Sequence, residues 1–406
     1  MYKQISLSLL LLLTLVFFAC EDDDNGEDDP TPTAAPDTLK SSYSNSVTLT
    51  NDPDLPIDYV GVSDVTFEDG SELIVEPGVV IAFESGVVVT FEDESEVHMN
   101  GTESERITLR GIEEMPGYWA GVSHMSSDVT NNWDYVDIMH TGSDEFGPTL
   151  DETTTALYLS GDGRLSVQNT QFMDNAGHGL SAFDGTRLPD FQNNHFESNA
   201  LAPIQISHDG VQYLDNSLTF DNNGESFVDI STDMRELSQE NLNGEHTWRF
   251  NVLPMHISGI VAGTDDQLTI EPGVHLRANS GDGEFEFDGS LILNGTETDS
   301  VRIDHVDEVA GAWNGIILID DASTYDFNYV SVGYAGGQAD YFYQETPANI
   351  YVQHEATLNI SNSSIHHSGN WGLSYEEGTL NGDAILNETN VNYYANSSGD
   401  KTVDDD

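Results

Sequence analysis

Carboxylate side chains are the most abundant groups in this sequence that could do chemistry. The chain of 406 residues holds 72 aspartates and glutamates. Several stand close together: Asp134 and Asp137, Asp320 and Asp321, and the run Glu92, Asp93 and Glu94. Such groups act as acid–base pairs or bind Ca²⁺ in other proteins, but with so many acids a solvated acidic surface is the favoured interpretation. There is no Asp-x-Asp-x-Asp-Gly loop, so we predict no cofactor and keep Ca²⁺ as the alternative.

Histidines are the second group of candidates, and there are 13 of them. His366 and His367 are adjacent, and the alternation of side chains along a strand predicts that they face opposite ways. We therefore do not expect this pair to share a metal ion. No Gly-x-Ser-x-Gly, His-Glu-x-x-His or phosphate-binding loop occurs, so we predict no catalytic residue.

Aromatic side chains could stack on sugar rings. Trp119 and Trp313 invite this interpretation, but both stand in the same Gly-x-Trp-x-Gly motif, which favours a packing role at a corner of the fold. A second group lies in or beside a glycine-containing loop: Tyr334, Tyr341, Phe342 and Tyr343. We predict these four as ligand-binding residues, with packing onto the layer beneath them as the alternative.

A long internal duplication sets the positions of all these side chains. Three motifs occur twice: Leu73–Val79 and Leu268–Val274, Asn100–Glu103 and Asn294–Glu297, and Gly117–Gly121 and Gly311–Gly315. The offset is 195 residues for Glu76 and Glu271 (271 − 76) and 194 for the two tryptophans (313 − 119). An offset this constant indicates a repeat architecture.

A shorter period lies within each half. Residues 168–175 match residues 192–199 at a step of 24, and residues 358–362 match 384–388 at a step of 26. Runs of three to five β-branched or apolar residues, each closed by Gly, Asn or Asp, fill the steps. This predicts an all-β solenoid, a right-handed parallel β-helix with three short strands per coil and two related halves. Phe172 would stack over Phe196 in the interior, and Asn169 over Asn193 at a corner.

These motifs together resemble the right-handed parallel β-helix repeat proteins of Bacteroidota, which belong to the pectate-lyase-like superfamily. The resemblance covers roughly residues 55–225 and 250–396. It implies the fold but no single activity, because such scaffolds carry lyases, hydrolases and adhesins. A lyase of this type would want a basic proton abstractor, and the repeats contain no lysine. The arginines that could serve are Arg110, Arg164, Arg277 and Arg302.

The charge balance restricts the partners. Acidic residues outnumber lysines and arginines 72 to 11, for a formal net charge of −61. Nucleic acid is excluded as a partner, because binding phosphates needs clustered cations. The same charge argues against long-range attraction of acidic polysaccharides and favours a soluble monomer in a saline habitat.

The N-terminus has the features of an export signal. Residues 1–20 contain Lys3, a mostly apolar run and Ala19 before Cys20, which is the only cysteine. This resembles a bacterial lipoprotein signal peptide and predicts lipid attachment at Cys20. Residues 21–50 begin with an acidic block and a Pro/Thr run, and we expect a flexible tether that resembles a surface-export signal. We predict an outer-membrane protein displayed on the cell surface, with the periplasmic face as the alternative.

The remaining boundaries are set by the repeats. We expect a first half over residues 51–225, a connecting insertion at 226–250, a second half at 251–396 and a disordered acidic tail at 397–406. We favour one continuous solenoid over two domains, because an end exposed mid-chain would need a cap.

The functional hypothesis is a binding or structural role toward glycans or neighbouring surfaces. The alternative is a polysaccharide lyase or glycoside hydrolase. Any function should lie where the two copies differ, and we name the loops 140–155 and 334–347 and the insertion 226–250.

Overall fold

The computed structural model describes residues 35–404 with internal gaps. The gaps are 148–152, 184, 232–241, 281–283, 320–322, 338–345, 354 and 378–382. The predicted signal peptide with Cys20 therefore lies outside the described residues. The chain divides into two units, Met1–Ala35 and Pro36–Asp406, and every described strand lies in the second unit.

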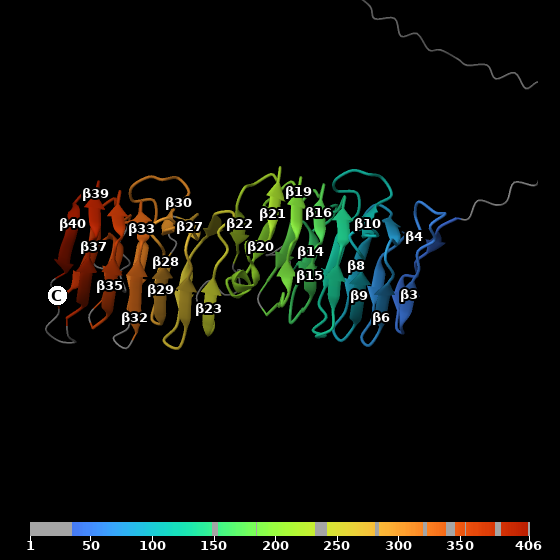
Figure 1. Ribbon diagram of the computed structural model, residues 1–406, viewed down its shortest axis with the longest axis horizontal. Helices are drawn as coiled ribbons and strands as arrows, with labels where there is room; N and C mark the ends of the chain where they lie inside the picture. Colours follow the sequence, from blue (N-terminus) through green and yellow to red (C-terminus); the bar gives the residue numbers. More distant parts are fainter. Residues whose placement is uncertain are drawn as a thin grey trace, which may run out of the picture. The chain divides into compact units, whose positions relative to one another are not determined.

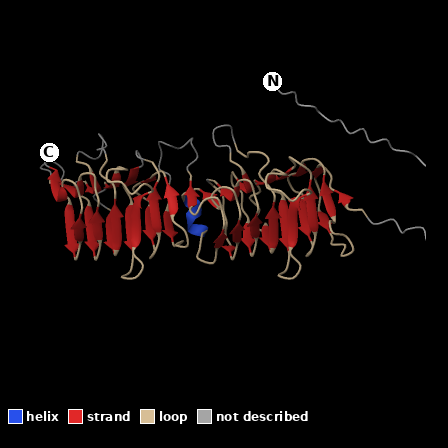
Figure 2. Cartoon of the chain, turned by 90° about the horizontal axis from the view of Figure 1, so that it is seen from above, coloured by secondary structure: helices blue, strands red, loops and turns tan. Residues whose placement is uncertain are grey.

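The second unit is built from short parallel strands stacked in several sheets (Figures 1 and 2). One sheet, which we call the shared sheet, runs through both copies. Its 14 strands in the described chain are β2 (Ser42–Tyr43), β5 (Val65–Phe67), β8 (Val88–Phe91), β11 (Gly121–His124), β14 (Thr155–Leu159), β17 (His178–Ala182), β20 (Ile204–Ile206), β22 (Val228–Ile230), β24 (Met255–Ile257), β27 (His275–Ala278), β30 (Val301–His305), β33 (Val330–Gly333), β36 (Ser364–His366) and β39 (Asn392–Tyr394).

Two further sheets belong to the first copy. One contains β1 (Asp37–Thr38), β4 (Tyr59–Gly61), β7 (Val80–Phe83), β10 (Ile107–Gly111), β13 (Val136–Met139), β16 (Gln171–Met173), β19 (His195–Glu197) and β21 (Thr219–Asp221). The other contains β3 (Val47–Leu49), β6 (Glu72–Val75), β9 (Glu96–Asn100), β12 (Asn132–Asp134), β15 (Ser166–Gln168) and β18 (Phe191–Gln192).

Two different sheets complete the second copy. One contains β23 (Glu245–Trp248), β26 (Gln267–Ile270), β29 (Ser290–Asn294), β32 (Thr324–Asn328), β35 (Thr357–Ser361) and β38 (Ile385–Thr389). The other contains β25 (Ile260–Ala262), β28 (Glu284–Phe287), β31 (Gly315–Leu318), β34 (Ala348–Val352), β37 (Trp371–Glu376) and β40 (Gly399–Asp404). Away from the junction around η1, each coil thus gives one strand to each of three sheets, which confirms the predicted parallel β-helix.

Between the copies, the repeat shifts by one strand relative to the shared sheet. In the first copy the strand after the Gly-x-Trp-x-Gly motif, β11, lies in the shared sheet. Its equivalent in the second copy, β31, lies in another sheet, and the shared sheet instead receives β27, which comes directly after Glu271-Pro272-Gly273. Equivalent residues of the two copies therefore face different sides of the solenoid. The short 3₁₀ helix η1 (Asp209–Tyr213) lies at this junction.

Aromatic side chains stack along the interior, because parallel strands in register place like residues above one another. Phe172 and Phe196 stack at 4.8 Å between ring centroids and 5° between planes, as predicted. Within the described part of the first copy, no hydrogen bond joins the side chains of Asn169 and Asn193, and an amide ladder lies at another corner instead. Asn175 donates to Asn199, and Asn199 to Asn223, both at 2.8 Å.

Both ends of the solenoid extend beyond the expected boundaries. The first coil begins at Asp37 rather than near residue 51, because Leu39 and Leu49 already contribute to the buried core. At the other end, Gly399–Asp404 forms β40 where a disordered tail was expected. Lys401 lies beside Leu373 in register and forms an ion pair with Glu388. The last coil thus replaces apolar interior residues with a charged pair, which ends the core without exposing a large apolar face.

Candidate ligand-binding face

Titratable and aromatic side chains collect on the outer side of the shared sheet in the second copy. Register pairs place Asp229 beside His256, His256 beside Arg277, and Arg277 beside Asp304. The row continues with Gly333, which lies one residue past the last register pair between β30 and β33. Gly333 is the register partner of His366, and His366 is the register partner of Tyr394. We call this row, with the side chains that touch it, the binding face.

Arg277 is a cation of the binding face, and two of its three guanidinium nitrogens have hydrogen-bond partners. Its Nε donates to Asp304 at 3.0 Å and one terminal nitrogen to Glu308 at 2.8 Å. The same nitrogen donates to the carbonyls of His305 and Val306. Burial acts to raise the pKa of Asp304, but the hydrogen bonds and charges of His275 and Arg277 outweigh it and hold that pKa below its usual value. Asp304 is therefore ionised, and it holds the side chain of Arg277 in place through their ion pair.

A cluster of four rings lies at the far end of the binding face. Tyr334 stacks on His367 at 5.1 Å, and His366 stacks on Tyr394 at 4.9 Å. Ser331 lies 3.0 Å from Nε2 of His366, which fixes that imidazole from the other side. Tyr394 is 42% exposed and Tyr334 partly exposed, so solvent reaches part of the cluster.

His366 and His367 do not face opposite ways, so the expectation from strand alternation is wrong. Their Nδ1 atoms lie 2.9 Å apart. The reason is that His367 comes after the last residue of β36 and has a left-handed backbone with φ of 51°, which ends the alternation. The short contact is a hydrogen bond between the two rings.

Gly333 makes room for this cluster. A Cβ atom at this position would lie 2.4 Å from Cε1 of His366, closer than atoms can approach. In the first copy the equivalent residue, 194 positions earlier, is Met139, and the register neighbour of Met139 is Met173 rather than a histidine. The equivalents of Tyr334 and His367 are His140 and Asp174, with nearly the same backbone angles. The scaffold is therefore common to both copies, and the ring cluster belongs to the second alone.

The other predicted binding residues have different outcomes. Tyr341, Phe342 and Tyr343 lie outside the described residues, as do Asp320 and Asp321. Trp119 and Trp313 are fully buried, which confirms the packing interpretation. Their Nε1 atoms donate to equivalent carbonyls, those of Met139 at 2.8 Å and Gly333 at 3.0 Å.

The loops 140–155 and 334–347 were predicted to mark differences between the copies, but they occupy equivalent places. The first comes after β13 and the second after β33, its equivalent. In the first copy the described part of the loop places Phe146 against Tyr158 on the outer side of the shared sheet. Both copies thus have a connection at the same point of the repeat, and among the described residues the side chains beside it differ.

The clustered acids serve local structure. Asp137 is held by Arg106 at 2.6 Å, and Asp134 accepts from Asn169 at 2.8 Å, in a different sheet. Asp93 accepts from the backbone of Glu94 and from Ser127. These acids therefore serve to hold neighbouring strands and turns in place.

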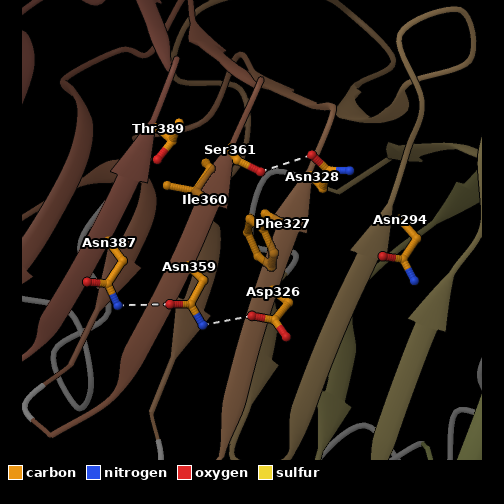
Figure 3. Close-up of a pocket in the computed structure, with 9 residues that line it drawn as sticks. All are labelled: Asn294, Asp326, Phe327, Asn328, Asn359, Ile360, Ser361, Asn387 and Thr389. Carbon is orange, nitrogen blue, oxygen red and sulfur yellow. Dashed lines mark hydrogen bonds between the residues drawn. The ribbon is translucent and has the colours of Figure 1, made fainter.

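A polar hollow of about 340 Å³ lies on a neighbouring sheet of the second copy (Figure 3). Amide side chains form a ladder across it, from Asn387 to Asn359 at 2.8 Å and from Asn359 to Asp326 at 2.7 Å. Ser361 donates to Asn328 at 2.9 Å along its upper edge. Phe327 and Ile360 lie in the same strands but are buried, so the hollow offers no exposed ring.

The chain was compared with protein-family models, with curated proteins and with solved structures, and no match was found. Among the described residues, no helix is long and apolar enough to cross a membrane. The functional assignment therefore depends on the geometry of the faces.

Proposed function

We propose that this chain is a lipid-anchored cell-surface protein that binds a neutral polysaccharide along the binding face of its second copy. The observation that carries the proposal is the ring cluster of Tyr334, His366, His367 and Tyr394, which is partly exposed and has no counterpart in the first copy. Aromatic faces stack on sugar rings, and the hydroxyl and imidazole groups at their edges supply hydrogen bonds.

The charge of the chain favours a neutral ligand. A formal net charge of −61 repels acidic polysaccharides at long range. Arg277, which could otherwise attract a carboxylate, is already paired with two carboxylates of the chain, those of Asp304 and Glu308. Recognition would then rest on ring stacking and hydrogen bonds rather than on ion pairs.

An enzyme on the same face has one observation in its favour, the carboxylates of Asp304 and Glu308 beside Arg277. One feature weighs against it. The guanidinium of Arg277 is paired with both carboxylates, so it is not available as a proton abstractor.

Affinity electrophoresis through gels that contain plant or algal polysaccharides tests the binding proposal. We expect at least one neutral polysaccharide to retard the chain and Tyr394→Ala to weaken that binding about tenfold, which corresponds to about 1.4 kcal/mol. Glu197→Ala, at the equivalent strand of the first copy, is the matched control and should bind like the wild type. No retardation by any polysaccharide, or equal retardation of Tyr394→Ala, would contradict the proposal. If the chain releases unsaturated or reducing-end products from a polysaccharide, with or without Ca²⁺, the binding proposal would be replaced by the polysaccharide lyase or glycoside hydrolase.

The anchor is tested separately. We expect globomycin, which blocks lipoprotein signal peptidase, to cause the precursor to accumulate in cells, and Cys20→Ser to abolish lipid labelling. If the precursor is still cleaved in the presence of globomycin, the lipid anchor is contradicted. The proposal that the binding face binds a polysaccharide would not be affected.

A further inference from the structure

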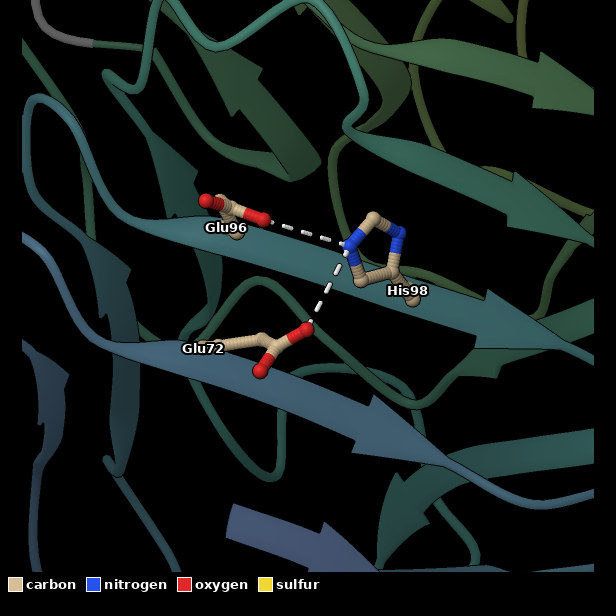
Figure 4. A group of neighbouring side chains, drawn as sticks. All are labelled: Glu72, Glu96 and His98. Atoms are coloured by element: carbon tan, nitrogen blue, oxygen red, sulfur yellow. Dashed lines mark ion pairs between the residues drawn. The ribbon is translucent and has the colours of Figure 1, made fainter. Parts of the chain in front are cut away.

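The first copy carries a cluster of its own, on the sheet of β6 and β9. Glu72 and Glu96 are register partners on these adjacent strands, and His98 lies two residues after Glu96 on the same side (Figure 4). Nε2 of His98 is 3.6 Å from a carboxylate oxygen of Glu96 and 3.9 Å from one of Glu72. If each residue offers one ligand atom, these three atoms all lie within 4.8 Å of one another.

The arrangement brings two like charges together without a fixed cation. Carboxylates directly opposite each other on neighbouring strands repel. No ion pair among the described residues joins either glutamate to a lysine or arginine, and His98 is the partner that both share. Ser46 donates to the second oxygen of Glu72 at 2.7 Å and turns its other oxygen toward the imidazole.

The duplication supplies an internal reference that shows the fold does not require these residues. In the second copy the register pair that corresponds to Glu72 and Glu96 is Gln267 and Ser290. Ile292 stands in the place of His98. The same coil is therefore built without a carboxylate or an imidazole at any of the three positions, so the cluster is an addition to the scaffold.

We propose that Glu72, Glu96 and His98 bind one divalent transition-metal ion of the Zn²⁺ type. An imidazole nitrogen among the ligands favours Zn²⁺, Co²⁺, Ni²⁺ or Cu²⁺ over Ca²⁺ and Mg²⁺, which take oxygen ligands. Ligand bonds of 2.0 to 2.2 Å place two ligands of a tetrahedral zinc about 3.4 Å apart, so small rotations of the glutamates suffice to close the site. Three protein ligands leave the remaining positions to solvent, because all three side chains are partly exposed.

The test is a zinc titration of the purified, untagged chain in competition with a chromogenic chelator. We expect one Zn²⁺ per chain that binds more tightly than the weak sites of the acidic surface. The double variant Glu96→Ser with His98→Ile, which carries the residues of the second copy, should weaken this binding by about 100-fold or more. Zinc should also raise the melting temperature of the wild type but not that of the variant.

His195→Ala is the matched control, because His195 and Glu197 repeat the His/Glu contact at 3.5 Å. Asp221 stands beside Glu197 in register, but the ligand atoms of these three described residues do not all come within 4.8 Å of one another. This variant should keep the zinc site. Circular dichroism of all variants establishes that they are folded. The absence of a stoichiometric site in the wild type, or unchanged affinity in the double variant, would overturn the proposal.

Discussion

Replacing Trp313 by alanine is expected to lower the free energy of unfolding by about 3–5 kcal/mol. The indole is fully buried against Phe285, and its Nε1 satisfies the carbonyl of Gly333. The substitution removes this packing, leaves a cavity and leaves a buried carbonyl without its partner. Chemical denaturation followed by circular dichroism measures the loss.

Trp119→Ala provides the comparison within the same molecule. Trp119 is equally buried, stacks on Phe83 and donates to the equivalent carbonyl, so a loss of similar size is expected. A loss below about 1 kcal/mol in both variants would mean that the indoles are exposed, and the stacking interpretation of these residues would return.

Acidification is the second change with a large expected effect. Burial lowers the pKa of both His124 and His208 to about 4, although hydrogen bonds with backbone carbonyls act in the opposite direction. Each histidine binds its proton with a pKa near 6.5 in the unfolded chain, so the folded state takes up fewer protons as the pH falls. The contribution of these histidines to the free energy of unfolding is therefore constant above pH 6.5 and decreases between pH 6.5 and pH 4. By pH 4 the loss is about 3 kcal/mol per histidine.

His124→Phe tests the cause of this loss. His124 continues an interior stack of aromatic rings through Phe67 and Phe91, so a phenyl ring suits the site although it leaves the carbonyl of Arg164 unpaired. The decrease in unfolding free energy between pH 7 and pH 5 should shrink by about 2 kcal/mol in this variant. Phe91→Leu, which disturbs the same stack without a titrating group, should leave that decrease unchanged. An unaltered pH dependence in His124→Phe would show that His124 is not held neutral.

The fold was predictable from the sequence because its cause is local and repeated. Coils of similar length place like residues above one another, so the match of residues 168–175 to residues 192–199 was sufficient to predict the stack of Phe172 on Phe196. The burial of the two tryptophans was predictable for the same reason, since a duplicated side chain in a turn motif indicates packing.

The shift of the repeat by one strand relative to the shared sheet could not be predicted in the same way. A repeat in the sequence records the order of strands along the chain, not the sheet that each strand joins. The junction around η1 and β23 decides this through tertiary contacts, such as those of His208 with the carbonyl of Gly259 and of His246 with Asp209. None of these has a counterpart in the repeat motifs.

From the sequence, Tyr334 was predicted as a binding residue without its ring partners, and the glutamate–histidine cluster was not predicted at all. The ring cluster depends on the left-handed backbone of His367, which strand alternation does not anticipate. The glutamate–histidine cluster had a usable signal in the sequence. Glu72 lies 24 residues before Glu96, which is the length of one coil, and His98 follows two residues later. Comparison of the two copies position by position, rather than loop by loop, would have found both.

Hydrogen–deuterium exchange with a bound neutral oligosaccharide tests the central claim most directly. We expect amide protection in the second copy at residues 330–337, 364–369 and 392–397, which carry the ring cluster. The equivalent residues of the first copy, 136–142, 171–176 and 195–199, should exchange as in the free chain. Protection of both sets alike, or protection confined to other residues, would contradict the assignment of binding to the second copy.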